Sequence, residues 1–354
     1  MSKDTVKVGI IGSMFAADLH ISGYSRLPHV EVVAVAAKNE EEARPFGEKH
    51  GIPNIFGDYK QMIAMPEIDL VSVAVPNFLH HDIVLEVCKA GKHMICEKPL
   101  ATTLADAEEM VAAVKDAGVK LMYAEDWIFA PSLMRAKEIV DEGAIGDVLF
   151  MKAKECHNGS HSIYAQQKKF CGGGAMIHLA IHPLGWVRWL KGQEVVEVLA
   201  KMSGGEEKNL LHKDYTGEDW SLAVLTFEDG TSALIEGNYI TWGGIDDRIE
   251  VYGSEGSVHI NLTQGSPVSC YSRPGLKYAI EKSDMTTGWT KPAVDEWWQL
   301  GYCDEIAHFV DCVRFDREPA AGVRPEDGIA CMRILDAIYR SAASGKVEKV
   351  ETGS

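Results

Sequence analysis

The chain is poor in positive charge and has no long hydrophobic run. Its 354 residues include 35 Lys and Arg against 52 Asp and Glu, which gives a formal net charge of −17. This balance argues against nucleic acid or an anionic membrane as the main partner. The start, Met1-Ser2-Lys3-Asp4, has no signal-peptide pattern, and no apolar run is long enough to span a bilayer. We therefore expect a cytoplasmic protein.

The sequence also lacks a C-x-x-C pair, an internal repeat and any low-complexity segment. Its eight cysteines are scattered, and several lie in apolar runs. This pattern is typical of reduced, buried thiols rather than a disulfide framework. Apolar residues make up 46% of the chain, and its length suffices for two domains that each bury a core.

Strand-like and helix-like stretches alternate through the first third of the chain. Strands are expected at Val6–Ile11, Val30–Ala36, Leu70–Val75, His93–Cys96 and Lys120–Ala124. Helices are expected at Ala16–Leu27, Glu40–His50, His81–Ala90 and Ala105–Ala117. The last three helices are each followed by glycine, as helix ends often are. The rhythm predicts an α/β fold that begins with a doubly wound parallel sheet of the Rossmann type over residues 1–124.

The pattern changes after Pro131, and residues 125–354 are expected to form a second α/β domain. A helix at Ser132–Glu142 precedes longer alternating strands, and amphipathic helices close the chain. The strands are expected at Val148–Glu155, Val195–Met202, Ser221–Phe227, Thr231–Tyr239, Arg248–Tyr252, Ser257–Asn261 and Val268–Ser272. They predict a large, mostly antiparallel open sheet. Its exposed face carries apolar residues, so we expect a homo-oligomer that forms through this sheet.

The run Gly9-Ile10-Ile11-Gly12-Ser13-Met14-Phe15-Ala16-Ala17 lies where the first strand turns into the first helix. The dinucleotide fingerprint at such a turn is G-x-G-x-x-G/A. Gly12 fills the first position and Ala17 is allowed at the third. Met14 stands at the second, where a side chain should crowd the phosphates. A plain strand–helix turn is the alternative interpretation.

The end of the second strand bears on the adenosine ribose. An acidic residue there would bind the 2′-hydroxyl of NAD. This chain instead has Ala36-Ala37-Lys38-Asn39, which allows NADP and slightly favours it, because no carboxylate repels a 2′-phosphate. Lys38 as a solvated loop residue is the competing interpretation, so NAD and NADP both stay open.

A lysine is expected at the carboxyl end of the fourth strand, in Cys96-Glu97-Lys98-Pro99-Leu100. The segment Val75-Pro76-Asn77-Phe78-Leu79-His80 ends the strand before it. Ligands of open α/β sheets bind outside the carboxyl ends of the strands. Lys98 is therefore placed to meet a bound cofactor, although an ordinary strand-end turn is the alternative.

These segments resemble the Gfo/Idh/MocA family, which includes glucose–fructose oxidoreductase and inositol dehydrogenase. The resemblance continues through Gly172-Gly173-Gly174-Ala175 … His182, Gly253-Ser254-Glu255-Gly256-Ser257 and Glu326-Asp327-Gly328, and covers nearly the whole chain. The Glu-Lys-Pro and Gly-Gly-Gly…His segments are its most specific part. It implies a Rossmann domain followed by an open-sheet domain, with the last helices packing back near the first domain.

The resemblance implies hydride transfer between a nicotinamide and a secondary alcohol carbon, usually on a sugar or cyclitol. Lys98 would lie near the reacting hydroxyl, and His182 would act as general acid/base. Oxidising an alcohol needs a base for the hydroxyl proton, and a positive nicotinamide disfavours the charged form of a neighbouring lysine. The expected cofactor-binding set is Gly12, Met14, Phe15, Ala16, Lys38, Asn39, Pro76, Asn77, His80, Glu97 and Lys98.

Many relatives have Asp four residues before the catalytic histidine, where this chain has His178. His178 and His182 are expected at i and i+4 on one face of a helix. Glu155, His157 and His161 precede them, so several imidazoles should converge above the nicotinamide. The preferred interpretation is a substrate pocket in which His157, His161 and His178 bind hydroxyls. A zinc-type site and plain loop histidines are the alternatives, and no metal is expected because H-E-x-x-H is absent.

Trp127 and Tyr164 are further substrate-binding candidates, with core packing as the alternative for each. The prediction is an NAD(P)-dependent oxidoreductase acting on a secondary hydroxyl of a sugar, glycoside or cyclitol, in which His178 assists Lys98 and His182. One rival is a redox-neutral enzyme that retains its nicotinamide, oxidises a sugar transiently and cleaves a glycosidic bond. The other is a regulatory protein that binds but does not turn over.

Overall fold

The computed structural model describes residues 3–283 and 286–351. The chain divides into two compact units. The first holds the residues up to Asp126 together with Gly301–Ile329, and the second holds Trp127–Leu300 and the residues from Ala330 onward. The sequence-based division placed all of 125–354 in one domain, whereas the segment 301–329 groups with the first unit.

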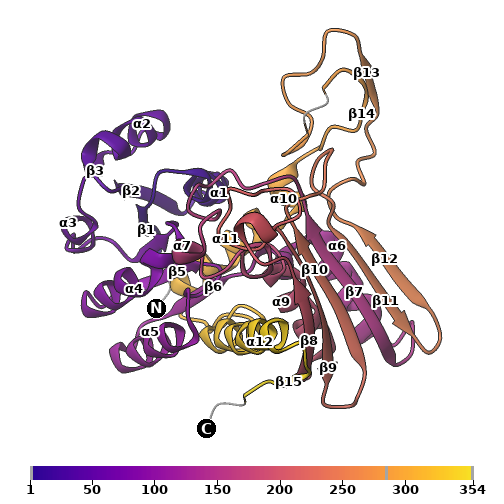
Figure 1. Ribbon diagram of the computed structural model, residues 1–354. Helices are drawn as coiled ribbons and strands as arrows, with labels where there is room; N and C mark the ends of the chain where they lie inside the picture. Colours follow the sequence, from indigo (N-terminus) through magenta and orange to yellow (C-terminus); the bar gives the residue numbers. More distant parts are fainter. Residues whose placement is uncertain (1–2, 284–285, 352–354) are drawn as a thin grey trace. The chain divides into compact units, whose positions relative to one another are not determined.

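The first unit is built on a six-stranded parallel sheet (Figure 1). Its strands are β1 (Val6–Ile11), β2 (Val30–Ala36), β3 (Asn54–Phe56), β4 (Leu70–Val73), β5 (His93–Glu97) and β6 (Leu121–Ala124). The order β3-β2-β1-β4-β5-β6 reverses at β1, so the sheet is doubly wound and the predicted Rossmann fold is confirmed. Every strand is parallel to its neighbours, and therefore all carboxyl ends lie at one edge.

Six α-helices complete this unit. They are α1 (Phe15–Tyr24), α2 (Glu40–His50), α3 (Tyr59–Ile63), α4 (His80–Lys89), α5 (Leu104–Ala117) and α11 (Tyr302–Arg314). Side chains of Asn39, Asp58 and Thr103 cap α2, α3 and α5 at their N-termini, which is why these helices begin where they do. The short elements β3 and α3 were not predicted, because three to five residues carry too little periodicity.

The second unit contains a seven-stranded sheet in the order β12-β11-β7-β10-β9-β8-β15. Its strands are β7 (Val148–Cys156), β8 (Val195–Met202), β9 (Trp220–Phe227), β10 (Ser232–Asn238), β11 (Arg248–Gly253), β12 (Ser257–Asn261) and β15 (Glu348–Lys349). Only the β7–β10 pair is parallel. The prediction of a mostly antiparallel sheet is therefore confirmed.

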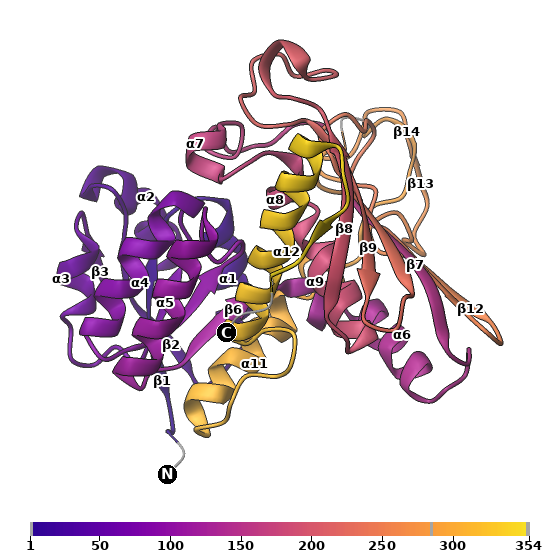
Figure 2. The same ribbon diagram turned by 60° about the horizontal axis from the view of Figure 1, so that its bottom comes forward.

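The two faces of this sheet differ in burial. Along β9 and β10 every second residue is buried, and these residues face the helical layer. The helices of the unit are α6 (Pro131–Asp141), α7 (Lys168–Cys171), α8 (Ala175–His178), α9 (Ile181–Lys191), α10 (Glu296–Gln299) and most of α12 (Pro325–Ser344). Figure 2 shows α8, α9 and α12 on one side of the sheet. The alternate residues, Leu222, Val224 and Leu234 among them, are half-exposed on the opposite face.

The expected strand at Val268–Ser272 differs from the structure. β13 covers only Cys270–Ser272 and pairs with β14 (Gly288–Thr290) in a separate hairpin. Figure 1 shows this hairpin standing away from the seven-stranded sheet of its unit. The N–H of Val268 donates to the hydroxyl oxygen of Ser266 at 3.1 Å instead of to a neighbouring strand. Among the residues that the structure describes, no helix is both long and apolar enough to cross a membrane.

Candidate active site

Gly12 shapes the first strand–helix turn. Its φ of +122° is a conformation that L side chains rarely adopt. A Cβ added here would lie 2.0 Å from the carbonyl oxygen of Ala74, at the end of β4. Its N–H donates to the carbonyl of Ala36 at 2.8 Å, which ties the turn to the end of β2. Only glycine fits this junction of three strand ends.

Met14 is the N-cap residue of α1, and no side chain caps this helix. Met14 is 55% exposed and Phe15 is 44% exposed. The first N–H groups of α1 thus point to the edge where the strands end, which suits the pyrophosphate of a dinucleotide. The glycine turn and the uncapped helix fit the predicted cofactor. Met14 and Phe15 lie exposed at the start of α1, and Ala16 lies within its first turn.

Lys38 and Asn39 are exposed after β2, but Asn39 is occupied. Its Oδ1 accepts the N–H of Glu42 at 2.9 Å, and its amide donates to the Glu42 carboxylate at 2.9 Å. The first turn of α2 carries Glu40, Glu41 and Glu42. Lys38 is thus followed by three glutamates, of which Glu40 pairs with Arg44.

Pro76 and Asn77 form the turn that leads into α4, and His80 begins that helix. The His80 ring is fully buried. Its Nδ1 lies 2.9 Å from the carbonyl oxygen of Pro99 and its Nε2 lies 2.9 Å from that of Val75. Burial lowers the pKa of His80 although both carbonyls favour its charged form. The ring ties together the loops after β4 and β5, and its contact with a dinucleotide stays a prediction.

Lys98 follows the last residue of β5 and is half-buried. Its backbone N–H donates to Oε2 of Glu97 at 3.3 Å. The other oxygen of Glu97 lies 2.8 Å from Nε2 of His20 on α1. Gly12, Lys38, Asn77 and Lys98 thus follow four strands whose carboxyl ends share one edge, as predicted for a cofactor cleft.

In the second unit His182 is the most enclosed of the predicted catalytic residues, at 3% exposed. Its ring stacks on Trp127, with ring centroids 5.8 Å apart and an interplanar angle of 19°. Its Nε2 lies 3.8 Å from Oε2 of Glu155 at the end of β7. Trp127 is 2% exposed, so the indole holds the imidazole, and its stacking on a substrate ring stays a prediction.

The prediction that His178 and His182 share one helix is wrong. α8 ends at His178 and α9 begins at Ile181. Pro183 has no N–H to donate to the Leu179 carbonyl four residues earlier. That carbonyl instead accepts the N–H of His182 at 3.2 Å, and the helix is interrupted.

His178 has a partner that the sequence did not reveal. Its Nδ1 lies 2.6 Å from the hydroxyl oxygen of Tyr239, which is fully buried. The ring of His157 lies 5.7 Å from the Tyr239 ring. β7 and β10 are parallel, with Cys156 opposite Asn238. The next residues, His157 and Tyr239, therefore emerge side by side, a placement that only the parallel pairing could have indicated.

His161 and Tyr164 lie farther out. The side chain of His161 is 59% exposed, and its Nε2 lies 3.2 Å from Oε1 of Glu281. The Lys282 ammonium donates to the carbonyl of Gly159 at 2.9 Å, so the segment before β14 is tied to the His161 loop. Tyr164 packs edge-on against Phe170. Within residues 3–283 and 286–351, no group of three or more potential metal ligands includes His157, His161 or His178.

The glycines of Gly172-Gly173-Gly174 permit a close approach. A Cβ on Gly173 would lie 1.8 Å from the Tyr339 hydroxyl oxygen, and one on Gly174 would lie 2.2 Å from the Glu218 carbonyl oxygen. Tyr339 donates to the buried Glu218 carboxylate at 2.9 Å. Burial raises the pKa of Glu218. These two residues support the loop before His178, and sequence analysis did not identify either of them.

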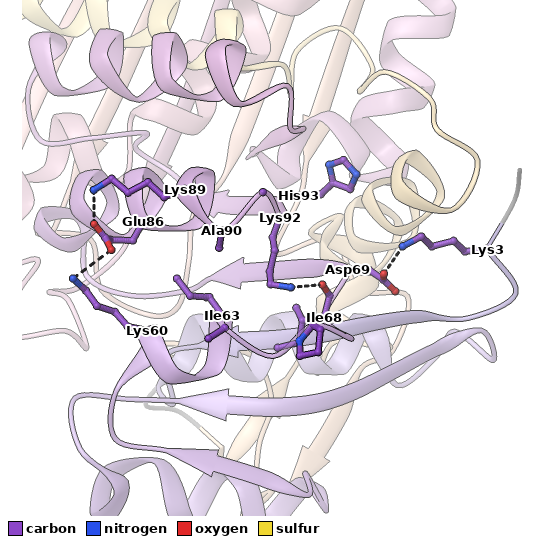
Figure 3. A pocket seen from close by; sticks show the side chains of 13 residues that line it. Lys3, Lys60, Ile63, Ile68, Asp69, Glu86, Lys89, Ala90, Lys92 and His93 are labelled. Atoms are coloured by element: carbon purple, nitrogen blue, oxygen red, sulfur yellow. Dashed lines mark hydrogen bonds and ion pairs between the residues drawn. The ribbon is translucent and has the colours of Figure 1, made fainter.

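The larger described cavity, of about 690 Å³, lies at the other edge of the first unit's sheet (Figure 3). It is lined by residues that precede strands, such as Asp69 before β4 and Lys92 before β5. Figure 3 shows its lysines paired: Lys3 with Asp69, and Lys60 and Lys89 with Glu86. Lys92 donates to the carbonyls of Met65 and Ile68, both at 2.8 Å. These contacts are structural, and we assign no ligand here.

The doubly wound sheet and its glycine turn define a dinucleotide-binding protein, and comparison with known proteins identifies the family. A model of an oxidoreductase family with an NAD-binding Rossmann fold matches residues 6–125. The model of the GFO/IDH/MocA C-terminal domain matches residues 133–259. The chain belongs to the Gfo/Idh/MocA family, and the resemblance stated above is confirmed. It is an NAD-dependent oxidoreductase.

Individual relatives match over nearly their full length. An uncharacterized oxidoreductase of Bacillus subtilis (strain 168), YrbE, is 30% identical, with 99% of this chain and 98% of that protein covered. A levoglucosan dehydrogenase of Pseudarthrobacter phenanthrenivorans is 28% identical, with 96% of each covered. The crystal structure of GenD2 from gentamicin A biosynthesis, in complex with NAD, has a TM-score of 0.91 at 26% identity and covers 99% of this chain and 98% of its own.

Proposed function

We propose that the chain is a dehydrogenase of a secondary hydroxyl on a sugar, glycoside or cyclitol, with Lys98 and His182 transferring the proton. The setting of His182 supports this most. Its ring is held on Trp127 with a carboxylate 3.8 Å from Nε2, the arrangement expected of a fixed acid/base. The name of the levoglucosan dehydrogenase relative agrees with a carbohydrate substrate.

Oxidation removes the hydroxyl proton and a hydride from the same carbon as the C=O bond forms. NAD, when bound, supplies the hydride acceptor. Lys98, at the end of β5, orients the hydroxyl and takes its proton directly or through His182. The Glu155 carboxylate stabilises the imidazolium of His182 once that proton has arrived. His178 and His157 hold the other hydroxyls.

The test follows the absorbance of reduced nicotinamide over a panel of sugars, cyclitols and glycosides, including levoglucosan. Sustained reduction with one substrate class supports the proposal. Glycoside consumption without net reduction would support the redox-neutral rival instead. In Lys98→Ala, turnover should fall by about 10²–10⁴-fold while NAD affinity stays near that of the parent. Lys89→Ala, at an exposed lysine paired with Glu86, is the matched control.

We infer a preference for NAD over NADP. The support is the charge at the end of β2, where Asn39 is held by Glu42 and three glutamates begin α2. A 2′-phosphate placed there would meet more negative than positive charge. The ratio of kcat/KM for NAD to that for NADP measures the preference, and a ratio below one would contradict the inference.

We also propose that the chain forms a homo-oligomer through the open face of the seven-stranded sheet. Val224 and Leu234 lie directly opposite each other at its centre and are half-exposed. Beside them Lys152 on β7 pairs with Glu250 on β11, and Lys154 on β7 pairs with Asp246, just before β11. An apolar centre with a charged rim is typical of a protein interface.

A further inference from the structure

A chain of buried polar side chains runs from the end of β5 into α1. Oε1 of Glu97 lies 2.8 Å from Nε2 of His20, and Nδ1 of the same ring lies 3.1 Å from Oγ of Ser72. That oxygen lies 2.6 Å from the hydroxyl of Tyr24. His20, Ser72 and Tyr24 are at most 1% exposed, while the Glu97 side chain is 12% exposed. The chain therefore begins beside Lys98 and ends in the core of the first unit.

In this chain of hydrogen bonds every donor points from Tyr24 towards Glu97. The Glu97 carboxylate can only accept, so Nε2 of the His20 ring donates to it. In the neutral ring Nδ1 then accepts from the Ser72 hydroxyl, and Ser72, whose single proton is used in this way, accepts from Tyr24. Burial alone would raise the pKa of Glu97, but the hydrogen bond from His20, with the charges nearby, outweighs burial and lowers it. Glu97 therefore accepts as a carboxylate.

The charged groups around these hydrogen-bonded side chains indicate their role. Lys98 and His80 are the other ionisable groups that act on Glu97, and Oε2 of Glu97 accepts the backbone N–H of Lys98. At the far end the fully buried Glu305 of α11 acts on Tyr24 through its charge. Tyr24 is itself 1% exposed, so the hydrogen-bonded chain does not open to solvent at that end. The hydrogen-bonded chain from Tyr24 to His20 therefore holds the negative charge of Glu97 in place.

We propose that Tyr24, Ser72 and His20 are positioning residues that keep the Glu97 carboxylate ionised and oriented beside Lys98. This rests on the proposed role of Lys98 as proton acceptor, because a carboxylate beside a lysine stabilises the ammonium form. Without the hydrogen bond from His20, burial raises the pKa of Glu97, which then takes up a proton at higher pH. The acid limb of the pH profile for oxidation therefore moves up.

The variants His20→Leu and His20→Gln test this, because glutamine keeps a side-chain N–H for Glu97 and leucine does not. The midpoint of the acid limb of kcat should rise by about one pH unit in His20→Leu, as expected for a carboxylate that loses a hydrogen bond to its charged form. It should stay near the parent value in His20→Gln. An unmoved midpoint in His20→Leu, with NAD affinity and thermal unfolding like the parent's, would overturn the proposal.

If His20→Leu prevents folding, Tyr24→Phe is the variant to use, because phenylalanine keeps the packing of Tyr24. It should move the midpoint in the same direction by less, whereas Tyr59→Phe, on α3 outside the chain, should not move it. A Tyr24→Phe profile identical to that of Tyr59→Phe would overturn the role of Tyr24.

A second measurement does not depend on turnover. Nitrogen NMR of the histidine rings, with His20 assigned by its loss in His20→Gln, should show the His20 proton on Nε2. Ser72→Ala should shift it toward Nδ1. A proton on Nδ1 in the parent protein would overturn the chain of donors whatever the substrate. If no substrate in the panel reduces NAD but the His20 proton is on Nε2, the proposed function alone would be rejected.

Discussion

The Tyr239 hydroxyl lies 2.6 Å from Nδ1 of His178, and this contact fixes the orientation of the His178 ring. Burial raises the pKa of Tyr239 well above its usual range, so the hydroxyl keeps its proton. A tyrosine hydroxyl both donates and accepts, so it is a partner for either tautomer of the ring. His178 is therefore held by a neutral hydroxyl from the end of β10.

The first prediction concerns that hydroxyl. Tyr239→Phe removes it and frees the ring of His178, so kcat/KM should fall by about threefold to tenfold, the effect of one neutral hydrogen bond. Steady-state kinetics on the best substrate measures it. Tyr252→Phe, on β11, is the control, since its hydroxyl bonds to Glu250 and lies on the open sheet face. Equal kinetics in both variants would contradict the role given to His178.

The second prediction separates two causes of strain at glycine. Gly12 and Gly51 both have positive φ, but a Cβ on Gly51 meets nothing within 4 Å. Gly51→Ala should therefore cost about 1 kcal/mol of unfolding free energy. Gly12→Ala adds the clash with Ala74, so it should cost more than about 2 kcal/mol and abolish NAD binding. Chemical denaturation and calorimetric titration with NAD measure both. Equal stability of the two variants would contradict the account of the turn.

The sequence predicted the fold well where the pattern was long and local. The strands of the first unit alternate with glycine-terminated helices, and the Rossmann fold followed from that rhythm. The hairpin of β13 and β14 was missed because its strands have three residues each. The break between α8 and α9 was missed because Pro183 lies within the first turn of α9, where a sequence pattern tolerates it.

The candidate site was less predictable, because its contacts join distant residues. Lys98 and His182 were identified by resemblance, yet the partners of the site histidines come from other elements. Glu155 reaches His182 from β7, and Tyr239 reaches His178 from the end of β10. The parallel β7–β10 pair sets that neighbourhood, and no local pattern distinguishes it from an antiparallel one.

The third prediction tests the open sheet face. The double variant Val224→Lys, Leu234→Lys places two charges at the centre of the proposed interface, so the oligomer should dissociate. Light scattering coupled to gel filtration gives the molecular mass. Met134→Lys, at a 40% exposed position on α6, is the control and should leave the mass unchanged. A double variant with the mass of the parent assembly would contradict the assignment of this face.

The last prediction concerns stability and pH. Glu218 is buried, and its carboxylate accepts from the Tyr339 hydroxyl at 2.9 Å and from the N–H of Met176 at 3.1 Å. Burial is the largest influence on its pKa and raises it above the usual range of a glutamate. The folded state therefore binds a proton that the unfolded state releases. This contribution to stability is fully present below the unfolded pKa and is lost as the pH rises through the folded pKa.

Glu218→Gln removes this loss, because a glutamine Oε1 can accept from both donors and never ionises. At neutral pH the variant should be more stable than the parent by on the order of 1 kcal/mol, and the difference should vanish below the usual range of a glutamate. Denaturant unfolding across pH measures the crossover. Glu207→Gln, at an exposed glutamate before β9, should follow the parent at every pH. If Glu218→Gln were less stable than the parent at neutral pH, the charge of Glu218 would stabilise the fold, and the destabilising effect ascribed to its burial would be wrong.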